Sequence, residues 1–401
     1  MNTMLKTAQD AIRNAAHELG YSNQLIDEFL RPEQEHHFRV KSGGKEYPAF
    51  RVQHSSRLGP YKGGIRFHHN VDQEEVQALA TLMSVKTAAV GLALGGGKGG
   101  VIVDPRQLTT EELEELARDY ARQLAPYIGS DKDIPAPDVN TDSQIMDWMV
   151  DEFEKITGKI DPGSFTGKSV SRGGSQGRTS ATGLGAVLVL KEYLKEKGLT
   201  KQPLTVALQG FGNAGYYFAQ GLQEHCPNLK IIAIANSKHT WVNRSGFDIS
   251  ATERDNAGPD SLKAAKSAEV LASEAVLFQK VDILVLAALE DSVTEGNVGS
   301  VPAKVIVEVA NGPVTMGAAE NLAKRGVAVL PDVVTNAGGV IVSYLEWEQN
   351  LRKQTWTEAE VIQKMSDRLI DAAREMFDRA EKRHINYKQA AFEIALKRLM
   401  G

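Results

Sequence analysis

Three lysines, Lys62, Lys86 and Lys98, lie close together along the chain, and two of them are flanked by glycines. Lys62 belongs to Pro60-Tyr-Lys-Gly-Gly-Ile-Arg66 and Lys98 to Gly95-Gly-Gly-Lys-Gly-Gly100. A lysine on a solvated helix needs no glycine beside it, whereas a lysine that meets a small anion needs neighbours without side chains. Ammonium groups that share a pocket repel one another unless a multiply charged anion lies between them, and crowding lowers the pKa of the most desolvated one. The pattern predicts a dicarboxylate site with a chemically active amine.

A second glycine-rich motif, Gly-Phe-Gly-Asn-Ala-Gly, follows the apolar run 204–208 and precedes the helical stretch 216–225. A strand, this motif and a helix, in that order, make up the dinucleotide-binding unit of a Rossmann fold. Gly210 would permit the tight turn, Gly212 would let a pyrophosphate approach the backbone, and Gly215 would allow close helix packing. The phosphates would face the helix N-terminus. We therefore predict a site for a nicotinamide dinucleotide.

The next expected strand, 230–235, ends in Asn236, where an acidic residue often holds the adenosine ribose. Asn236 can still hydrogen-bond a ribose hydroxyl, and it lacks the charge that would repel a 2′-phosphate. Lys238 and His239 could bind such a phosphate or could be ordinary surface loop residues. The expected cofactor is NAD or NADP, and the sequence leaves the choice open.

The elements that must position the lysines form a mixed α/β region. They are a helix over residues 1–32 ended by Pro32, a β-hairpin over 37–53, a helix over 74–90 that carries Lys86, a short strand over 101–103, a helix over 110–127, a loop over 133–141 and a helix from Ser143. The loop is expected because Pro135 and Pro137 each disrupt a helix or a strand ladder. Residues 163–177, rich in Gly, Ser and Thr, are the candidate domain hinge.

After a helix over 181–197, short apolar runs alternate with helical stretches. The expected strands are 204–208, 230–235, 281–286, 305–309 and 327–330. Runs buried on both faces predict a parallel sheet with helices on either side. Thr357 and Glu360 have capping-box spacing and open a C-terminal helical region. We expect an α/β protein with domains 1–178 and 179–352, followed by C-terminal helices, 353–401, that return toward the first domain.

Composition limits the function classes. The chain has 401 residues, of which 42% are hydrophobic and 24% charged, as in ordinary globular proteins of two or three domains. A net charge of −5 gives no electrostatic footprint for nucleic acid or an anionic membrane. The single cysteine, Cys226, excludes an intrachain disulfide and a cysteine-based metal cluster. With neither a signal peptide nor an apolar run of membrane-spanning length, we expect a soluble cytoplasmic protein without a metal.

From about residue 30 to its C-terminus the chain resembles the glutamate dehydrogenases, within the amino-acid dehydrogenase family of glutamate, leucine, phenylalanine and valine. The resemblance is to the compact type, and it implies an N-terminal α/β domain for substrate binding and oligomerisation, a Rossmann-type domain and a homohexamer. It also implies reversible NAD(P)-dependent oxidative deamination of L-glutamate to 2-oxoglutarate and ammonia. Hydride would leave Cα for the nicotinamide, and water would add to the resulting imine.

The resemblance further implies roles for single residues. Lys62 and Ser343 would bind the side-chain carboxylate of the substrate, and Lys86 and Arg178 its α-carboxylate. The implied catalytic residues are Lys98, beside which water is activated, and Asp138, which shuttles protons. The residues implied to line the cofactor, besides the three glycines and Asn236, are Thr182, Asn213, Asn311 and Asn336.

Some features leave other interpretations open. Asn311 and Asn336 precede glycine or Ala-Gly-Gly and could serve turns alone. Ser164 is polar where it precedes the family's Thr-Gly-Lys, and the sequence offers no interpretation of it.

Three alternative functions can be weighed. A branched-chain or aromatic amino-acid dehydrogenase would share Lys86, Lys98 and Asp138 but carry an apolar residue in place of Lys62, because an ammonium facing an aliphatic chain would be buried unpaired. A catalytically silent metabolite sensor would bind cofactor or dicarboxylate without turnover. A phosphate-loop NTPase is excluded, since Gly99 rather than Ser or Thr follows Lys98.

Overall fold

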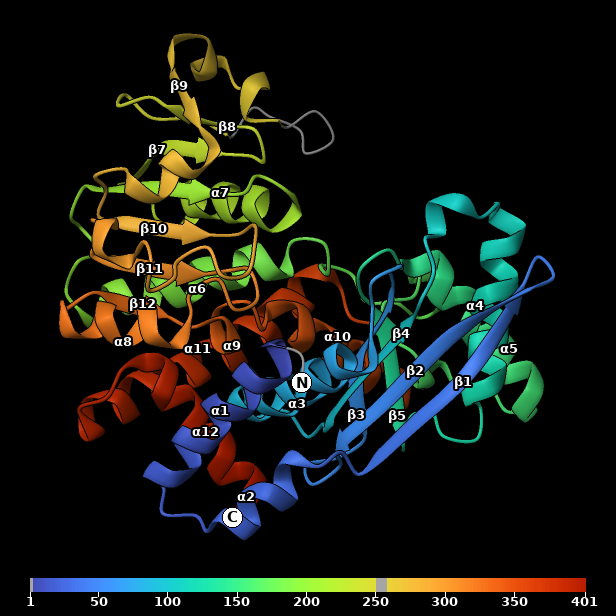
Figure 1. The fold of residues 1–401 in the computed structure, drawn as a ribbon. Helices are drawn as coiled ribbons and strands as arrows, with labels where there is room; N and C mark the ends of the chain where they lie inside the picture. Colours follow the sequence, from blue (N-terminus) through green and yellow to red (C-terminus); the bar gives the residue numbers. More distant parts are fainter. Residues whose placement is uncertain (1–2, 250–257) are drawn as a thin grey trace. The chain divides into compact units, whose positions relative to one another are not determined.

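The computed structural model describes residues 3–249 and 258–401, which form two compact units (Figure 1). Unit 1 comprises Met1–Arg178, Val340–Val361 and Phe392–Gly401, and unit 2 comprises Thr179–Gly339 and Ile362–Ala391. The chain therefore leaves unit 1 for the first time just after the glycine-rich segment 163–177. The three domain ranges expected from the sequence stay a prediction.

Unit 1 is built on a five-stranded sheet in the order β1-β2-β4-β3-β5. Its strands are β1 (Gln34–Ser42), β2 (Lys45–Ser55), β3 (Tyr61–Phe67), β4 (Gly96–Val101) and β5 (Asp133–Pro137). Its helices include α1 (Thr3–Glu18), α2 (Asn23–Leu30), α3 (Gln73–Ala89), α4 (Thr110–Leu124), α5 (Ser143–Thr157) and most of α10 (Gly338–Leu351). Apolar residues of α4 and α5 pack with Ile65, Phe67 and Val101 of the sheet, while Val76 and Ala80 of α3 pack with Val52.

Most elements expected in unit 1 are confirmed, among them the β1–β2 hairpin, which is antiparallel with Gln34 opposite Gln53. The single helix expected over residues 1–32 is wrong. Gly20 adopts a left-handed conformation with φ of +81° and ends the first helix, and the Ser22 side chain accepts a hydrogen bond from Leu25 N to begin α2. The expectation of one helix overlooked this stop and start signal.

The strand expected at 101–103 is also misplaced, because the glycine run itself forms β4. A side-chain carbon on Gly96 would overlap Ser84 of α3, and one on Gly99 would overlap the Tyr120 hydroxyl of α4. Glycine is therefore required here because a helix packs closely on each face of the strand. The packing of the protein itself, and not only access for a ligand, accounts for these glycines.

The loop expected at 133–141 is wrong for its first half, where residues 133–137 form β5. The strand lies at the sheet edge and pairs in parallel with β3 alone. The Pro135 carbonyl accepts a hydrogen bond from Thr166 N at 3.0 Å, on the side away from β3. The N–H and C=O groups of a strand residue point to the same side. An amide hydrogen at position 135 would therefore point away from β3, so its absence in proline costs no hydrogen bond between β5 and β3.

Unit 2 is built on a seven-stranded sheet in the order β12-β11-β10-β6-β7-β8-β9. Its strands are β6 (Leu204–Gln209), β7 (Leu229–Ala235), β8 (His239–Val242), β9 (Glu269–Ala272), β10 (Ile283–Leu286), β11 (Val305–Glu308) and β12 (Ala328–Leu330). The five expected strands are confirmed as a parallel set. β8 and β9 add an antiparallel edge that was missed, and no residue of β9 is buried.

Figure 1 also shows the helices of unit 2. They are α6 (Ala181–Glu196), α7 (Asn213–His225), α8 (Met316–Lys324), α9 (Asp332–Thr335), and, from the C-terminal region, most of α11 (Glu358–Arg383) and the start of α12 (Tyr387–Met400). The predicted capping box is present before α11, since Glu360 N donates to Thr357 Oγ1 and Thr357 N donates to Glu360 Oε2.

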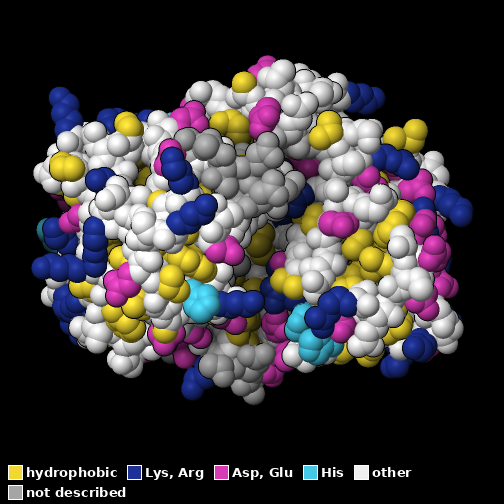
Figure 2. Space-filling model, turned by 90° about the horizontal axis from the view of Figure 1, so that it is seen from above, with side chains coloured by type: hydrophobic (Ala, Val, Ile, Leu, Met, Phe, Trp, Pro, Cys, Tyr) yellow, Lys and Arg dark blue, Asp and Glu magenta, His cyan; other side chains and the backbone are white. Residues whose placement is uncertain are grey.

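Two surface properties follow from the described residues. None of their helices combines the length and apolar character that crossing a membrane requires. On the face drawn in Figure 2, Lys and Arg side chains are interspersed with Asp and Glu side chains.

Candidate active site

The sheet of unit 1 brings the two predicted catalytic residues into contact. Lys98 lies on β4, and Asp138 directly follows β5, with β3 between them. Lys98 Nζ is 2.7 Å from an Asp138 carboxylate oxygen. Gly64 of β3 makes this approach possible, because a side-chain carbon there would lie 2.7 Å from Asp138 Cβ.

The Asp138 carboxylate has a second cationic neighbour, Arg66, whose Nε donates to it at 3.2 Å. Burial acts to raise the pKa of Asp138, but the charges of Lys98 and Arg66 outweigh burial and lower it. The backbone N of Asp138 donates to Thr141 Oγ1, which in turn donates to Ile65 O. The site thus holds an ionised carboxylate in a fixed position. Sequence reasoning missed Arg66, which was read only as the end of the lysine motif.

Lys62 on β3 carries a buried ammonium group. Only 2% of the residue is exposed, and no hydrogen-bond or ion-pair partner of its ammonium group occurs among residues 3–249 and 258–401. Burial lowers its pKa well below the usual value, and the positive charges of Arg178 and Arg51 add to this effect. Such a group favours an anion that enters from outside, since an unpaired buried ammonium is costly.

Arg178 and Lys86 are the cations expected at the α-carboxylate. Burial lowers the pKa of Arg178, whose guanidinium has no ion-pair partner within the described part of the chain. Lys86 is half-buried in the last turn of α3. The end of that helix is held by Arg398 Nη1, which donates to the carbonyl of Ala88 at 2.6 Å and to that of Ala89 at 3.1 Å.

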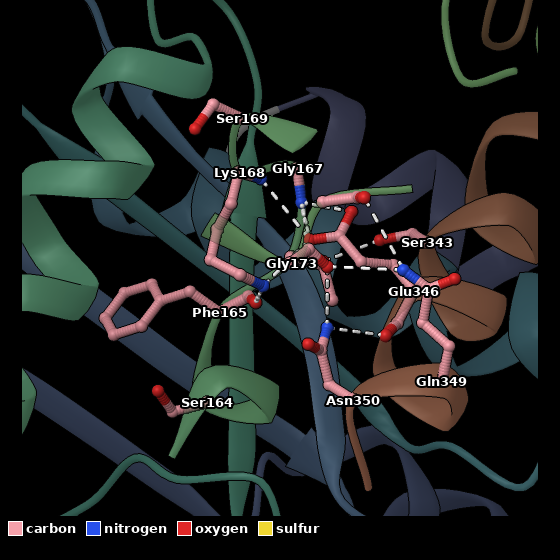
Figure 3. A network of polar contacts seen from close by, with 12 residues as sticks. Ser164, Phe165, Gly167, Lys168, Ser169, Gly173, Ser343, Glu346, Gln349 and Asn350 are labelled. Atoms are coloured by element: carbon pink, nitrogen blue, oxygen red, sulfur yellow. Dashed lines mark hydrogen bonds and ion pairs between the residues drawn. The ribbon is translucent and has the colours of Figure 1, made fainter. Parts of the chain in front are cut away.

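Ser343, expected beside Lys62, belongs to a buried polar network on α10 (Figure 3). Its hydroxyl is 2.6 Å from Thr166 Oγ1. One helical turn further on, the Glu346 carboxylate accepts hydrogen bonds from Gly167 N and from Lys168 Nζ, both at 2.8 Å. Sequence reasoning missed Thr166, Lys168 and Glu346, and the only available signal was the Thr-Gly-Lys segment.

One buried ion pair supports the site without having been predicted, and Ser164 has a local structural role. Arg51 Nε donates to Asp133 Oδ2 at 2.8 Å and Arg51 Nη1 donates to Gly63 O at 3.1 Å, so this fully buried pair ties β2 to β3 and β5. The unexplained Ser164 is buried, and its hydroxyl donates to Asp161 O at 2.6 Å. Ser164 therefore closes its own turn.

The predicted glycine motif of unit 2 has the local geometry of a dinucleotide site. Gly210 follows β6 with φ of +90°, which only glycine adopts readily. A side-chain carbon on Gly215 would overlap the Gly210 carbonyl oxygen, whereas no described atom lies within 4 Å of the corresponding position at Gly212. The open space at Gly212, beside the N-terminus of α7, fits an approaching pyrophosphate. The Asn213 side chain donates to Thr179 O at 2.8 Å.

The other residues expected to line the cofactor also lie in unit 2. Asn236 follows β7, and its Oδ1 accepts hydrogen bonds from Lys238 N and His239 N, so the side chain stabilises a turn. Asn336 Nδ2 donates to Asn311 Oδ1 at 3.0 Å, which brings these two segments together beyond β11. Thr182 lies in the first turn of α6. Since carboxyl ends of parallel strands share one sheet edge, the loops after β6, β7 and β11 lie where such folds bind nucleotides.

Two family models cover most of the chain. The model described as glutamate/leucine/phenylalanine/valine dehydrogenase matches residues 173–401, and the one described as Glu/Leu/Phe/Val dehydrogenase, dimerisation domain, matches residues 32–155. The chain belongs to the Glu/Leu/Phe/Val dehydrogenase family. The family resemblance and the two-domain α/β class expected from the sequence are thereby confirmed.

Individual relatives of this family agree over nearly the whole chain. The chain is 38% identical to the NAD-specific glutamate dehydrogenase of Staphylococcus aureus (strain COL), covering 99% of this chain and 96% of that protein. It is similar to the crystal structure of glutamate dehydrogenase from Peptoniphilus asaccharolyticus, with 38% identity, coverage of 98% and 96%, and a TM-score of 0.85. A hetero-hexameric glutamate dehydrogenase from Thermus thermophilus in a Leu-bound form gives a TM-score of 0.90 with 32% identity and coverage of 99% and 95%.

Proposed function

We propose that this member of the family is a glutamate dehydrogenase, which catalyses the reversible oxidative deamination of L-glutamate to 2-oxoglutarate and ammonia. One observation carries the choice of substrate. The buried Lys62 ammonium has no partner in the described part of the chain, and a substrate with a side-chain carboxylate would supply one. An aliphatic or aromatic side chain would leave this cation unpaired. The names of the relatives support the same substrate.

In this proposal the substrate's two carboxylates bind to separate cations. Lys62 and Ser343 bind the side-chain carboxylate, and Lys86 and Arg178 bind the α-carboxylate. The guanidinium of Arg178 lies close to Gly167, so close that a side-chain carbon on that glycine would overlap it. Two fixed anchor points at opposite ends of a short substrate would orient Cα and its hydrogen before reaction.

Lys98 and Asp138 are the proposed catalytic residues for the chemistry at Cα. A bound nicotinamide dinucleotide supplies the hydride acceptor. The ionised Asp138 accepts a proton from the substrate's amino group, and Lys98 orients the water that adds to the imine carbon. Asp138 then returns a proton to the departing ammonia. The contact of 2.7 Å between the two side chains supports this division of roles.

The cofactor and the assembly belong to the same proposal. We take NAD or NADP as the cofactor, held by the glycine motif and Asn311, Asn336 and Thr182, and NAD is the first to test because the Staphylococcus relative is named NAD-specific. A homohexamer is proposed because the Thermus structure is described as hetero-hexameric. The cytoplasm is the proposed compartment, since the one cysteine, Cys226, is a buried free thiol.

The test is an assay of NADH and NADPH formation with glutamate, leucine, norleucine, valine and phenylalanine, for the wild type and for Lys62→Leu combined with Ser343→Val. Loss of charge-assisted contacts should lower kcat/KM for glutamate by about 10- to 100-fold, while activity on apolar amino acids persists or rises. Wild type without turnover on any amino acid would favour the silent sensor. A variant that loses all substrates equally would show that Lys62 is not a specificity residue.

A further inference from the structure

Lys168 and Glu346 form an ion pair that the proposed reaction does not use. Both side chains are 0% exposed, and Lys168 Nζ lies 2.8 Å from Glu346 Oε1. Figure 3 shows the ammonium between this carboxylate and the carbonyl of Phe165, to which it also donates. Burying two charges costs more than packing apolar side chains of similar size in many proteins, so such a pair is weak support for stability alone.

The pair is joined to the proposed binding site for the side-chain carboxylate by direct bonds. Ser343 lies one helical turn before Glu346 on α10, and its hydroxyl contacts Thr166. Thr166 N donates to Pro135 O, and β5 pairs with β3 so that Ile134 is opposite Lys62. The Glu346 carboxylate and the Lys62 ammonium therefore lie on neighbouring segments of one buried region.

The charge of the Glu346 carboxylate also affects the pKa of the Lys62 ammonium. Burial and the charge of Arg178 lower the pKa of Lys62, and the Glu346 carboxylate opposes this effect. The same carboxylate opposes the effect of burial on Arg178. Glu346 is nevertheless bonded elsewhere, because its oxygens accept hydrogen bonds from Gly167 N and Lys168 N as well as from Lys168 Nζ.

This arrangement avoids a competition that the charges would otherwise create. A buried carboxylate without its own cation is attracted to nearby cations. Lys62 and Arg178, whose pKa values Glu346 affects, have no ion-pair partner in the part of the chain described here. A Glu346–Lys62 pair would occupy the cation proposed to bind the substrate's side chain. Lys168 supplies the cation that Glu346 needs. The backbone amides of Gly167 and Lys168 hold the Glu346 carboxylate on segment 166–168.

We propose that Lys168 is a specificity-determining positioning residue, which holds the Glu346 carboxylate on segment 166–168 and so keeps the Lys62 ammonium available for the side-chain carboxylate of the substrate. This inference rests on the proposed role of Lys62 in binding glutamate. Neither Lys168 nor Glu346 touches the substrate. Each acts through the charge balance of the pocket.

The experiment compares Lys168→Met with the double variant Lys168→Met/Glu346→Gln in steady-state kinetics on glutamate. In the single variant Glu346 turns to Lys62, so KM should rise about tenfold or more with kcat within about threefold of wild type. The double variant removes the competing carboxylate, and its KM should return to within about threefold of wild type. A pair that is merely structural predicts a double variant at least as impaired as the single one, and that outcome overturns the proposal.

Controls separate the possible failures. Lys159→Met changes an exposed lysine of the same unit and should leave KM unchanged. If Lys62→Met leaves KM for glutamate unchanged, the proposed function of Lys62 fails. If Lys62→Met raises KM but the double variant is not restored, only the role of Lys168 fails. Thermal unfolding checks each variant, and if Lys168→Met does not fold, a KM for the double variant about tenfold above wild type still overturns the proposal.

Discussion

Asp138 faces two cations, since its carboxylate lies 2.7 Å from Lys98 Nζ and 3.2 Å from Arg66 Nε. These charges lower its pKa against the effect of burial, so the carboxylate is ionised and can accept a proton at neutral pH. The same charges make it a weak base. We therefore expect it to relay protons between substrate groups and water rather than to retain one.

Asp138→Asn tests this role at the residue scale. The amide has nearly the same shape and can still accept a hydrogen bond from Lys98, but it cannot take up a proton at neutral pH. The variant should lose about 10²- to 10⁴-fold in kcat while KM for glutamate changes little. Steady-state kinetics and calorimetric titration of glutamate give the two quantities. Retention of more than about a tenth of wild-type kcat would contradict the assigned role.

At this scale some site residues were predictable and others were not. Lys62 and Lys98 stand out because glycines flank them, and Asp138 because prolines precede it. The pairing of Lys168 with Glu346 joins positions separated by 178 residues and leaves no spacing signal. Glu346 itself looks like an ordinary polar residue of a helix, and only the fold shows what it meets.

At the scale of elements, tertiary packing overrode local preference in unit 1. Glycine and proline both disfavour strands, yet β4 is a run of glycines and β5 contains Pro135 and Pro137. β4 needs glycine because α3 and Tyr120 pack closely against it. β5 tolerates proline because it is the edge strand of its sheet. Neither reason is visible before the partners are known. The parallel strands of unit 2 were predictable because most of their own residues are apolar.

The glycine motif after β6 offers a matched pair of variants. Gly212 has φ of −78°, and no described atom lies within 4 Å of the position that a side-chain carbon would take, so Gly212→Val should leave the unfolding temperature nearly unchanged. It should weaken cofactor binding by about tenfold or more, because the added side chain fills the space proposed for the pyrophosphate.

Gly215→Val is the structural counterpart, since its side chain would overlap the Gly210 carbonyl oxygen. It should lower the unfolding temperature by several degrees. Calorimetric titration of NAD and thermal unfolding report on the two effects separately. An unchanged affinity for NAD in Gly212→Val would contradict the proposal that the pyrophosphate binds at Gly212.

At the scale of the whole molecule, the last helix contributes to both units. α12 begins in unit 2, where Lys388 Nζ lies 3.0 Å from Glu308 Oε1 and donates to Val314 O. It ends in unit 1, where Arg398 binds the carbonyls that end α3. The C-terminal region therefore supports the helix that carries Lys86 in one unit and the end of β11 in the other.

Glu308 makes the stability of the protein dependent on pH. Burial raises its pKa from 4.5 to about 7, even though Lys388 acts in the opposite direction. Between these two values the folded chain binds this proton more tightly than the unfolded chain does. The contribution of Glu308 to stability is therefore complete below pH 4.5 and is lost as the pH rises through about 7.

Thermal unfolding of the wild type and of Glu308→Gln, measured from pH 5 to pH 8, tests this dependence. The glutamine cannot titrate, so the stability of the wild type relative to the variant should fall across this range, by about 1–3 kcal/mol. Glu320→Gln, at an exposed position of the same unit, should show no comparable trend. A difference that stays constant or grows with pH would mean that Lys388 keeps Glu308 ionised throughout, and the ion pair rather than burial would then govern this part of unit 2.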